Sequence, residues 1–148
     1  MLYVLFVCEH NSARSQMAEA YLQRLGGDEV VVESCGLEAG ILNPLVIEAM
    51  AEEGFDLSAK TTQTAFELIK KGRSYDVVIT VCSQKASEQC PLFPGRVLRL
   101  NWPFDDPSRL EGSHEEKLVR VREIREQIKA QVMAFLEEYR KQGASLLL

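Results

Sequence analysis

Residues 2–27 read LYVLFVCEHNSARSQMAEAYLQRLGG, and this stretch predicts a strand, a short loop and a helix. Leu2–Val7 is apolar throughout and runs directly into a cysteine, as expected of a buried strand. From Ser15 the apolar side chains recur at helical spacing, and the pair Gly26-Gly27 marks the end of the helix. A buried strand followed by a helix is the first half of a strand–helix–strand unit, so the stretch favours a parallel sheet.

The rest of the chain repeats this alternation. Further strands are predicted at residues 30–36, 76–81 and 96–100, and further helices from Pro44 up to Gly54, over residues 64–71 and from Ser113 onward. The last helix carries an apolar stripe from Leu118 to Tyr139 that is suited to covering a sheet. The pattern implies one α/β domain over residues 1–148, with parallel strands, helices on both faces and functional residues at the carboxyl ends of the strands.

Composition excludes several classes of function. A chain of 148 residues with 46% hydrophobic residues is long enough to bury one real core. Its net charge of −5 and sequence pI of about 5.1 disfavour nucleic acid and anionic membranes as partners. The longest apolar run, Met1–Val7, is too short to span a bilayer and lacks the basic flank of a signal peptide. We therefore expect a cytoplasmic protein.

The four cysteines stand at positions 8, 35, 82 and 90. Cytosolic thiols are normally kept reduced, so these residues indicate chemistry rather than structural disulfides. No two of them form a C-x-x-C motif, and the chain has only two histidines, so we expect no metal site.

Cys8 and Arg14 enclose a five-residue loop at the carboxyl end of the first predicted strand, directly before a helix. The loop consists of Glu9, His10, Asn11, Ser12 and Ala13. Backbone N–H groups of such a loop and the helix N-terminus attract a tetrahedral oxyanion, and the same field favours a nucleophilic thiolate at Cys8. Arg14 offers a planar fork for two oxyanion oxygens, and Ser15 can donate a hydrogen bond to the thiolate. The alternative is a buried cysteine that ends a strand, beside a solvated arginine.

Two features of the loop are unusual. It contains no glycine, so a positive φ angle would have to be adopted by His10 or Asn11. Glu9 places a carboxylate at the rim of an anion site, which would weaken its affinity for oxyanions. Neither feature removes a reacting group.

The sequence Cys-x5-Arg-Ser, followed by Gln16-Met17-Ala18-Glu19, resembles the low-molecular-weight tyrosine phosphatase family, and within it the arsenate reductase branch. The similarity extends through Asn43-Pro44, Glu48-Ala49-Met50, Leu57-Ser58, Val81-Cys82-Ser83 and residues 102–107. The resemblance implies a four-stranded parallel sheet of the flavodoxin-like type flanked by helices, and a loop that takes arsenate or other tetrahedral oxyanions.

Residues 102–107, WPFDDP, hold two carboxylates in a rigid apolar frame. Attack of a thiolate on an oxyanion expels an oxygen that leaves more easily when an acid protonates it. Burial of one carboxylate beside another would favour its protonated form. The resemblance assigns the acid to Asp106, with Asp105 as the competitor; the alternative is a solvated Asp-Pro turn.

Cys82 follows the strand at residues 76–81, so it should emerge at the same sheet edge as Cys8. It could attack a Cys8–arsenic adduct at sulfur, release arsenite and leave a Cys8–Cys82 disulfide, which Cys90 could then exchange for a Cys82–Cys90 disulfide. The resemblance makes thioredoxin the external dithiol that reduces this pair, with no bound cofactor.

A helix over residues 82–90 would separate the two Cα atoms by about 12 Å, too far for a disulfide, so this segment would have to rearrange. Relatives coupled to thioredoxin commonly have six residues between these thiols, and this chain has seven. The alternative is that Cys82 and Cys90 are two unrelated buried thiols. Cys35 is expected to be a packed bystander.

Two other functions stay open. A tyrosine phosphatase would hydrolyse phosphate esters through a phosphocysteine, but phosphatases of this family often have tyrosines after the Asp-Pro, where this chain has Ser108-Arg109-Leu110. A module that only binds oxyanions or senses redox state would need neither a nucleophile nor an acid. Some relatives respond to potassium, and three polar residues could contribute ligands near the loop: Asn11, Glu19 and Ser34.

Overall fold

The structure is a computed structural model that describes residues 1–143 and 145. Its centre is a four-stranded parallel sheet in the order β2-β1-β3-β4. The strands are β1 (Leu2–Cys8), β2 (Val30–Gly36), β3 (Val77–Thr80) and β4 (Leu98–Asn101). The expected α/β class and parallel sheet are confirmed, while the expected end of the domain at residue 148 lies outside the described residues.

The fourth strand begins later than predicted. Residues 94–96 form a bend in which Gly95 has a φ of 91°, so the chain becomes extended only from Leu98. Leu98 N–H donates to the carbonyl of Asp76 at 3.0 Å, which aligns β4 with the start of β3.

Among the described residues, five α-helices and two 3-10 helices connect and cover the strands. They are α1 (Arg14–Gly26), η1 (Gly27–Glu29), α2 (Pro44–Ala51), α3 (Ala65–Lys70), α4 (Gln84–Ser87), η2 (Pro107–Arg109) and α5 (His114–Gln142). The helix expected to run up to Gly54 ends at Ala51, and Thr64 and Ser113 are N-caps rather than helical residues. The sequence did not predict α4.

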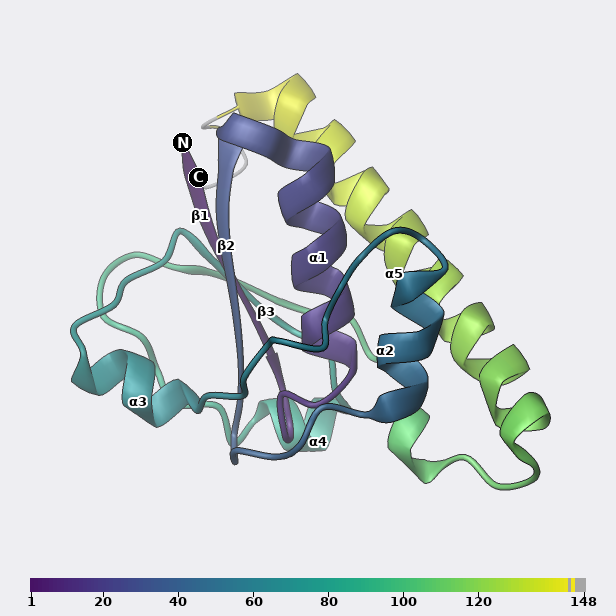
Figure 1. The fold of residues 1–148 in the computed structure, drawn as a ribbon. Coiled ribbons are helices and arrows are strands. Elements are labelled where there is room, and N and C mark those ends of the chain that lie inside the picture. Colours follow the sequence, from purple (N-terminus) through teal and green to yellow (C-terminus); the bar gives the residue numbers. More distant parts are fainter. Residues whose placement is uncertain (144, 146–148) are drawn as a thin grey trace.

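The sheet separates two apolar cores because the side chains of β1 alternate between its faces. Val4 and Phe6 belong to a large core shared with α1, α2 and α5, whereas Leu5 and Val7 belong to a smaller core with α3. Figure 1 shows α1, α2 and α5 together on one side of the strands and α3 on the other. No helix among the described residues is both long and apolar enough to cross a bilayer.

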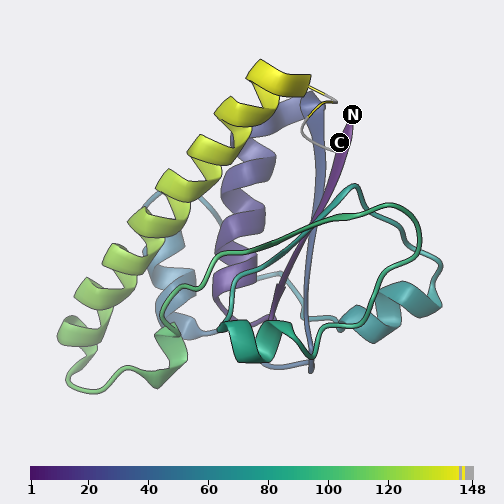
Figure 2. The same cartoon turned by 180° about the vertical axis from the view of Figure 1, so that it is seen from behind.

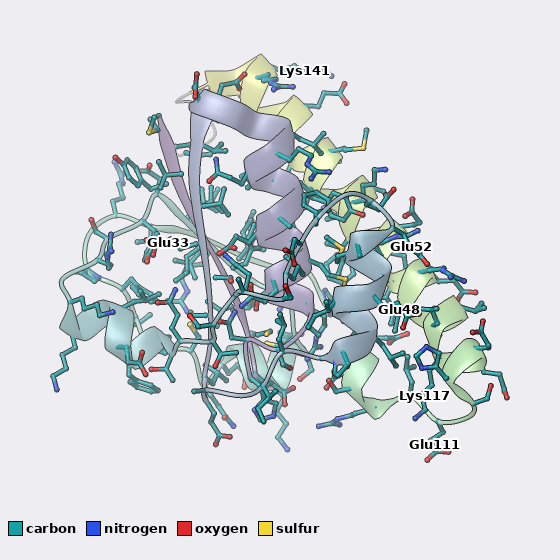
Figure 3. The ribbon with its side chains drawn as sticks, in the orientation of Figure 1. Glu33, Glu48, Glu52, Glu111, Lys117 and Lys141 are labelled. Carbon is teal, nitrogen blue, oxygen red and sulfur yellow. The ribbon has the colours of Figure 1, made fainter. Side chains whose placement is uncertain are left out.

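Ion pairs join α5 to α2 at the surface. Figure 3 shows Glu48 on α2 and Glu52 directly after it, both close to α5. Glu48 Oε2 lies 2.9 Å from His114 Nε2, and Glu52 pairs with Arg122 at 2.7 Å and Arg125 at 2.8 Å. Exposed pairs of this kind contribute little stability each, so the buried stripe of α5 is the main contact with the body.

The carboxyl ends of β1 and β3 meet at one edge of the sheet, where α1 begins and α4 lies (Figure 1). The N-terminus, where β1 begins, lies near the opposite edge, as the reverse view in Figure 2 also shows. The topology therefore places the loop after Cys8 beside the segment after Cys82, as the sequence predicted.

Candidate active site

The loop between β1 and α1 is held in a strained but well-supported conformation. The positive φ expected of His10 or Asn11 falls on Asn11, at 55°. Asparagine tolerates this region better than most residues, and here its buried amide donates to Ser15 Oγ at 2.9 Å and to Ser34 Oγ at 3.0 Å. Asn11 Oδ1 also accepts from the backbone N–H of Gln63 at 3.1 Å. The backbone of Asn11 therefore bends the loop, and the hydrogen bonds of its side chain hold the loop in this conformation.

Two donors converge on the sulfur of Cys8. The N–H of Asn11 lies 3.1 Å from Sγ, and Ser15 Oγ lies 2.9 Å from it. Because Ser15 Oγ already accepts from Asn11, its own proton is available to the sulfur. Helix α1 begins at Arg14 with no side-chain cap and no acidic residue in its first turn, which leaves its first N–H groups for an anion. The arrangement stabilises negative charge at Cys8 and beside it.

The segment after β2 packs directly against the back of the loop. Leu37 N–H donates to the carbonyl of Cys8 at 3.0 Å, and Glu38 N–H donates to that of Glu9 at 2.8 Å. A Cβ atom at Gly36 would lie 2.6 Å from the backbone nitrogen of Asn11, and one at Gly40 would lie 2.9 Å from the carbonyl oxygen of His10. These two glycines allow the close approach, and the sequence analysis did not single them out.

Arg14 is a buried part of the site and not a solvated arginine. It is only 5% exposed, and its Nη1 donates to the carbonyl of Phe104 at 3.0 Å. Its other terminal nitrogen, Nη2, lies 3.7 Å from Asp106 Oδ2 and 3.9 Å from Glu9 Oε1. The guanidinium thus connects the loop to the Asp-Pro turn.

The two adjacent carboxylates of that turn have different surroundings. Asp106 Oδ1 accepts from Ser108 N–H at 2.9 Å and caps η2, while Oδ2 faces Arg14. The Asp105 side chain is 71% exposed and pairs with Arg120 on α5. The two carboxylates line one cavity but have different partners, Arg14 for Asp106 and Arg120 for Asp105. The expected effect of one carboxylate on the other stays a prediction. Asp106 is the carboxylate that lies near the loop.

Asn43 joins the two halves of the site. Its N–H donates to the carbonyl of Ser12 at 2.9 Å, its Nδ2 donates to Ser108 Oγ at 3.1 Å, and its Oδ1 caps α2. Trp102, at the start of the segment that leads into the Asp-Pro turn, packs against the large core, where its ring centroid lies 5.8 Å from those of Phe6 and Phe135. In the sequence, Asn43 stood out only as part of the resemblance, although an Asn-Pro pair before a helix already indicates a cap.

Cys82 lies beside the loop and is fully buried. The backbone before it is fixed by Val81 N–H donating to the carbonyl of Val7 at 2.8 Å, and Asn101 Nδ2 donates to the carbonyl of Cys82 at 3.1 Å. Burial raises the pKa of the Cys82 thiol to about 11; Arg14 opposes this shift and Cys8 adds to it. The influence of both groups reflects how near Cys82 lies to the loop. In the resting protein Cys82 is a thiol, not a thiolate.

Cys90 lies in the smaller core, on the face of the sheet that α3 covers. It shares an apolar cluster with Cys35, Tyr75 and Phe93, and burial raises its pKa, an effect that Arg99 opposes. The helix α4 and mostly exposed residues separate it from Cys82. All four cysteines are free thiols. The expected rearrangement of the segment between Cys82 and Cys90 stays a prediction.

Cys35 is packed in the same cluster, as expected of a bystander, and burial raises the pKa of its thiol as well.

The three residues considered as potassium ligands have different hydrogen-bond partners. Asn11 and Ser34 are hydrogen-bonded together, whereas the carboxylate of Glu19 pairs with the ammonium of Lys60. Glu19 is thus already neutralised by a side chain.

Arg109 is a site residue that the sequence analysis did not recognise. Its Nη2 lies 3.9 Å from Glu9 Oε2, and its Nε lies 3.6 Å from Asp106 Oδ2. It lines a cavity of about 540 Å³ together with Glu9, Arg14 and Asp106, which is the open mouth above the loop. Its position after the Asp-Pro, where the related phosphatases often have tyrosine, was the clue in the sequence.

Comparisons with known proteins agree with this geometry. Residues 3–145 match the family described as low molecular weight phosphotyrosine protein phosphatase. An arsenate reductase from Halalkalibacterium halodurans is 41% identical over 135 residues, 90% of this chain and 94% of that protein. A solved arsenate reductase in its oxidized state superposes with a TM-score of 0.78 at 31% identity, over 93% of this chain and 98% of the other. A thioredoxin-dependent arsenate reductase from Corynebacterium glutamicum superposes with a TM-score of 0.61 at 28% identity, over 90% of this chain and 63% of the other.

Proposed function

The chain belongs to the low molecular weight phosphotyrosine protein phosphatase family, and we propose that its activity is the reduction of arsenate to arsenite. The single observation that carries the proposal is the free thiol of Cys82, which lies beside the anion loop of Cys8. An ester phosphatase needs one thiol, whereas reduction of an oxyanion needs a second thiol to take up the oxidation. The arsenate reductases at 31% and 41% identity support the same assignment.

The first step is attack by the sulfur of Cys8 on arsenate held by the loop and by Arg14. A sulfur–arsenic bond forms and an arsenic–oxygen bond breaks. Asp106 accepts a proton from another oxygen of the bound arsenate and passes it to the departing hydroxyl, which leaves as water. Backbone N–H groups of the loop, the start of α1 and the fork of Arg14 bind the remaining oxygens. This step changes no oxidation state.

The second step is the reduction. Cys82 attacks the sulfur of Cys8, so a Cys8–Cys82 disulfide forms and the sulfur–arsenic bond breaks, while the proton of Cys82 passes to an oxygen of the departing arsenite. The electron pair of that bond stays on arsenic, which leaves as arsenite. Cys90 then attacks Cys82, frees the thiolate of Cys8 and produces a Cys82–Cys90 disulfide. An external dithiol reduces this disulfide and restores the enzyme.

Thioredoxin is the proposed external dithiol, since one structural neighbour is named as thioredoxin-dependent. An enzyme recycled in this way works where thioredoxin is kept reduced, so the proposal places the protein in the cytoplasm. The protein itself needs no bound cofactor for the relay.

The experiment that tests the function measures two products from one preparation. Arsenite release should occur with arsenate and a thioredoxin–thioredoxin reductase couple, and nitrophenol release from its phosphate ester should be slow. Cys35→Ala serves as the control, because it removes a thiol that has no part in the relay. Hydrolysis of the ester without any arsenite release would replace this proposal with a phosphatase.

A further inference from the structure

Four charged side chains alternate around the mouth of the loop. Arg14 lies between Glu9 and Asp106 at 3.9 and 3.7 Å, and Arg109 lies between the same two carboxylates at 3.9 and 3.6 Å. The separations are too long for good hydrogen bonds, so these are loose ion pairs that an incoming ligand can replace. The four ionised groups carry no net charge together.

Glu9 creates an electrostatic problem for anion binding. Its carboxylate faces the same guanidinium that has to hold the oxyanion, and only 27% of the Glu9 side chain is exposed to screening solvent. The charge of Arg14 is therefore largely offset before an anion arrives. A doubly charged oxyanion would meet an approximately neutral site if Arg14 were the only arginine available.

Arg109 is placed to resolve this problem. It stands on η2, directly after the Asp-Pro turn, and reaches both Glu9 and Asp106 from the solvent side. Its side chain is 77% exposed, and its backbone N–H donates to the carbonyl of Asp106 at 3.2 Å, so the backbone is held while the guanidinium can turn. The cavity of about 540 Å³ below it leaves room for that movement.

We propose that Arg109 is a second oxyanion-binding residue. It pairs with Glu9 and Asp106 while the loop is empty, and it turns to bind the free oxygens of a small inorganic oxyanion once that anion enters the loop. The inference rests on the proposed function for its substrate, arsenate, and extends it by a residue that selects the substrate class. With its guanidinium across the mouth, Arg109 favours a free oxyanion over an ester, whose organic group would occupy the same place. Glu9 makes this second arginine necessary.

The test measures binding of inorganic phosphate, an unreactive oxyanion of the same shape, to the reduced full-length protein by titration calorimetry. Arg109→Ala should weaken phosphate binding about tenfold. This is the lower end of the loss expected when a charge-assisted hydrogen bond is removed, because the side chain is exposed. Arg109→Lys should lose less, since it keeps the charge without the fork. Arg120→Ala is the matched control: it removes the same charge from the same cavity wall but contacts Asp105 instead.

The decisive comparison is a double-mutant cycle with Glu9→Gln, which removes the opposing charge and keeps the size of the side chain. Glu9→Gln alone should tighten phosphate binding, and in that background Arg109→Ala should cost about threefold or less. An equal loss in both backgrounds, or unchanged binding in Arg109→Ala, would overturn the inference. Matching thermal melts establish that each variant is folded.

The same experiment separates this inference from the proposed function. Phosphate binding that depends on Arg109 and Glu9 as described would support the role of Arg109 even in a protein that released no arsenite. If the protein released arsenite but phosphate binding did not change in Arg109→Ala, the proposed function would stand and the role of Arg109 would be rejected.

Discussion

The anion loop at residues 8–15 and the thiol segment at residues 82–90 meet at one edge of the sheet, but they are built in opposite ways. Most of the loop is buried, although His10 is exposed, and its shape is fixed by Asn11 and by the close approach of Gly36 and Gly40. The thiol segment holds one short helix, and most of its side chains between the two cysteines face solvent. The proposed chemistry requires this difference: an oxyanion needs donors that are already in place, whereas a disulfide exchange needs sulfurs that can move.

The largest effect expected from the loop is that of Cys8→Ser. Arsenate reduction should be abolished, because a serine hydroxyl does not form the adduct that Cys82 resolves, while inorganic phosphate should still bind to the loop and Arg14. Steady-state arsenite release and calorimetric phosphate titration check the two halves of this prediction. Residual turnover near that of the wild type would show that the nucleophile lies elsewhere.

The thiol segment should fail in a different way. In Cys90→Ser one equivalent of arsenate should be reduced, after which the reaction stops with a Cys8–Cys82 disulfide. In Cys82→Ser even the first arsenite should be absent, because no thiol lies beside the adduct. Peptide mapping of the unreduced protein after exposure to arsenate identifies the disulfides.

Multiple turnovers without Cys90, or a disulfide between Cys8 and Cys35, would contradict this order of attack. Both segment variants should bind phosphate as the wild type does, which distinguishes a failed relay from a damaged loop.

Asp106→Asn should slow formation of the adduct by about 10²–10⁴-fold, the usual contribution of a positioned acid. Asp105→Asn is its matched control, since this neighbouring carboxylate lines the same cavity but pairs with Arg120 and not with Arg14. Rapid-quench measurement of a single turnover compares the two variants. The reverse ranking would assign the acid to Asp105.

The step that belongs to the thiol segment should depend on pH. Burial raises the pKa of Cys82 to about 11, so its thiolate is scarce at neutral pH and increases about tenfold for each pH unit up to that value. The rate of disulfide formation after adduct formation should rise accordingly between pH 7 and pH 10. A flat profile over this range would mean that the rearrangement of the segment, and not the thiolate, limits the step.

The smallest effect is expected from Gly36→Ala. The new methyl group would press on the backbone of Asn11, so phosphate affinity should fall by about tenfold while the relay thiols stay in place. Gly72→Ala is the control: its φ of 77° makes alanine costly to stability, but nothing lies near its Cβ position and phosphate binding should not change. Equal affinities in both variants would show that the loop is less rigid than its contacts indicate.

The strand, loop and helix of residues 2–27 were recognisable because their pattern is local. Apolar periodicity and glycine positions depend on the nearest neighbours in the chain, so they predicted the fold class and the place of Cys8, Arg14 and Cys82. The choice of Asp106 came from the resemblance, and the structure brings that carboxylate to Arg14. Boundaries such as the start of β4 were less accurate, because a bend at Gly95 delays the strand.

The sequence by itself determined the order of elements and which residue types stand at the ends of the strands. Only the tertiary structure decided that Asp105 turns to Arg120, that Cys90 is buried beside Cys35, and that Glu9 shares its arginines with Asp106. The physical reason is that most of these contacts join residues far apart along the chain, such as Glu9 with Arg109 and Cys35 with Cys90. The packing of helices and turns over the end of the sheet decides which of these side chains meet, and a local sequence pattern carries no information about that packing.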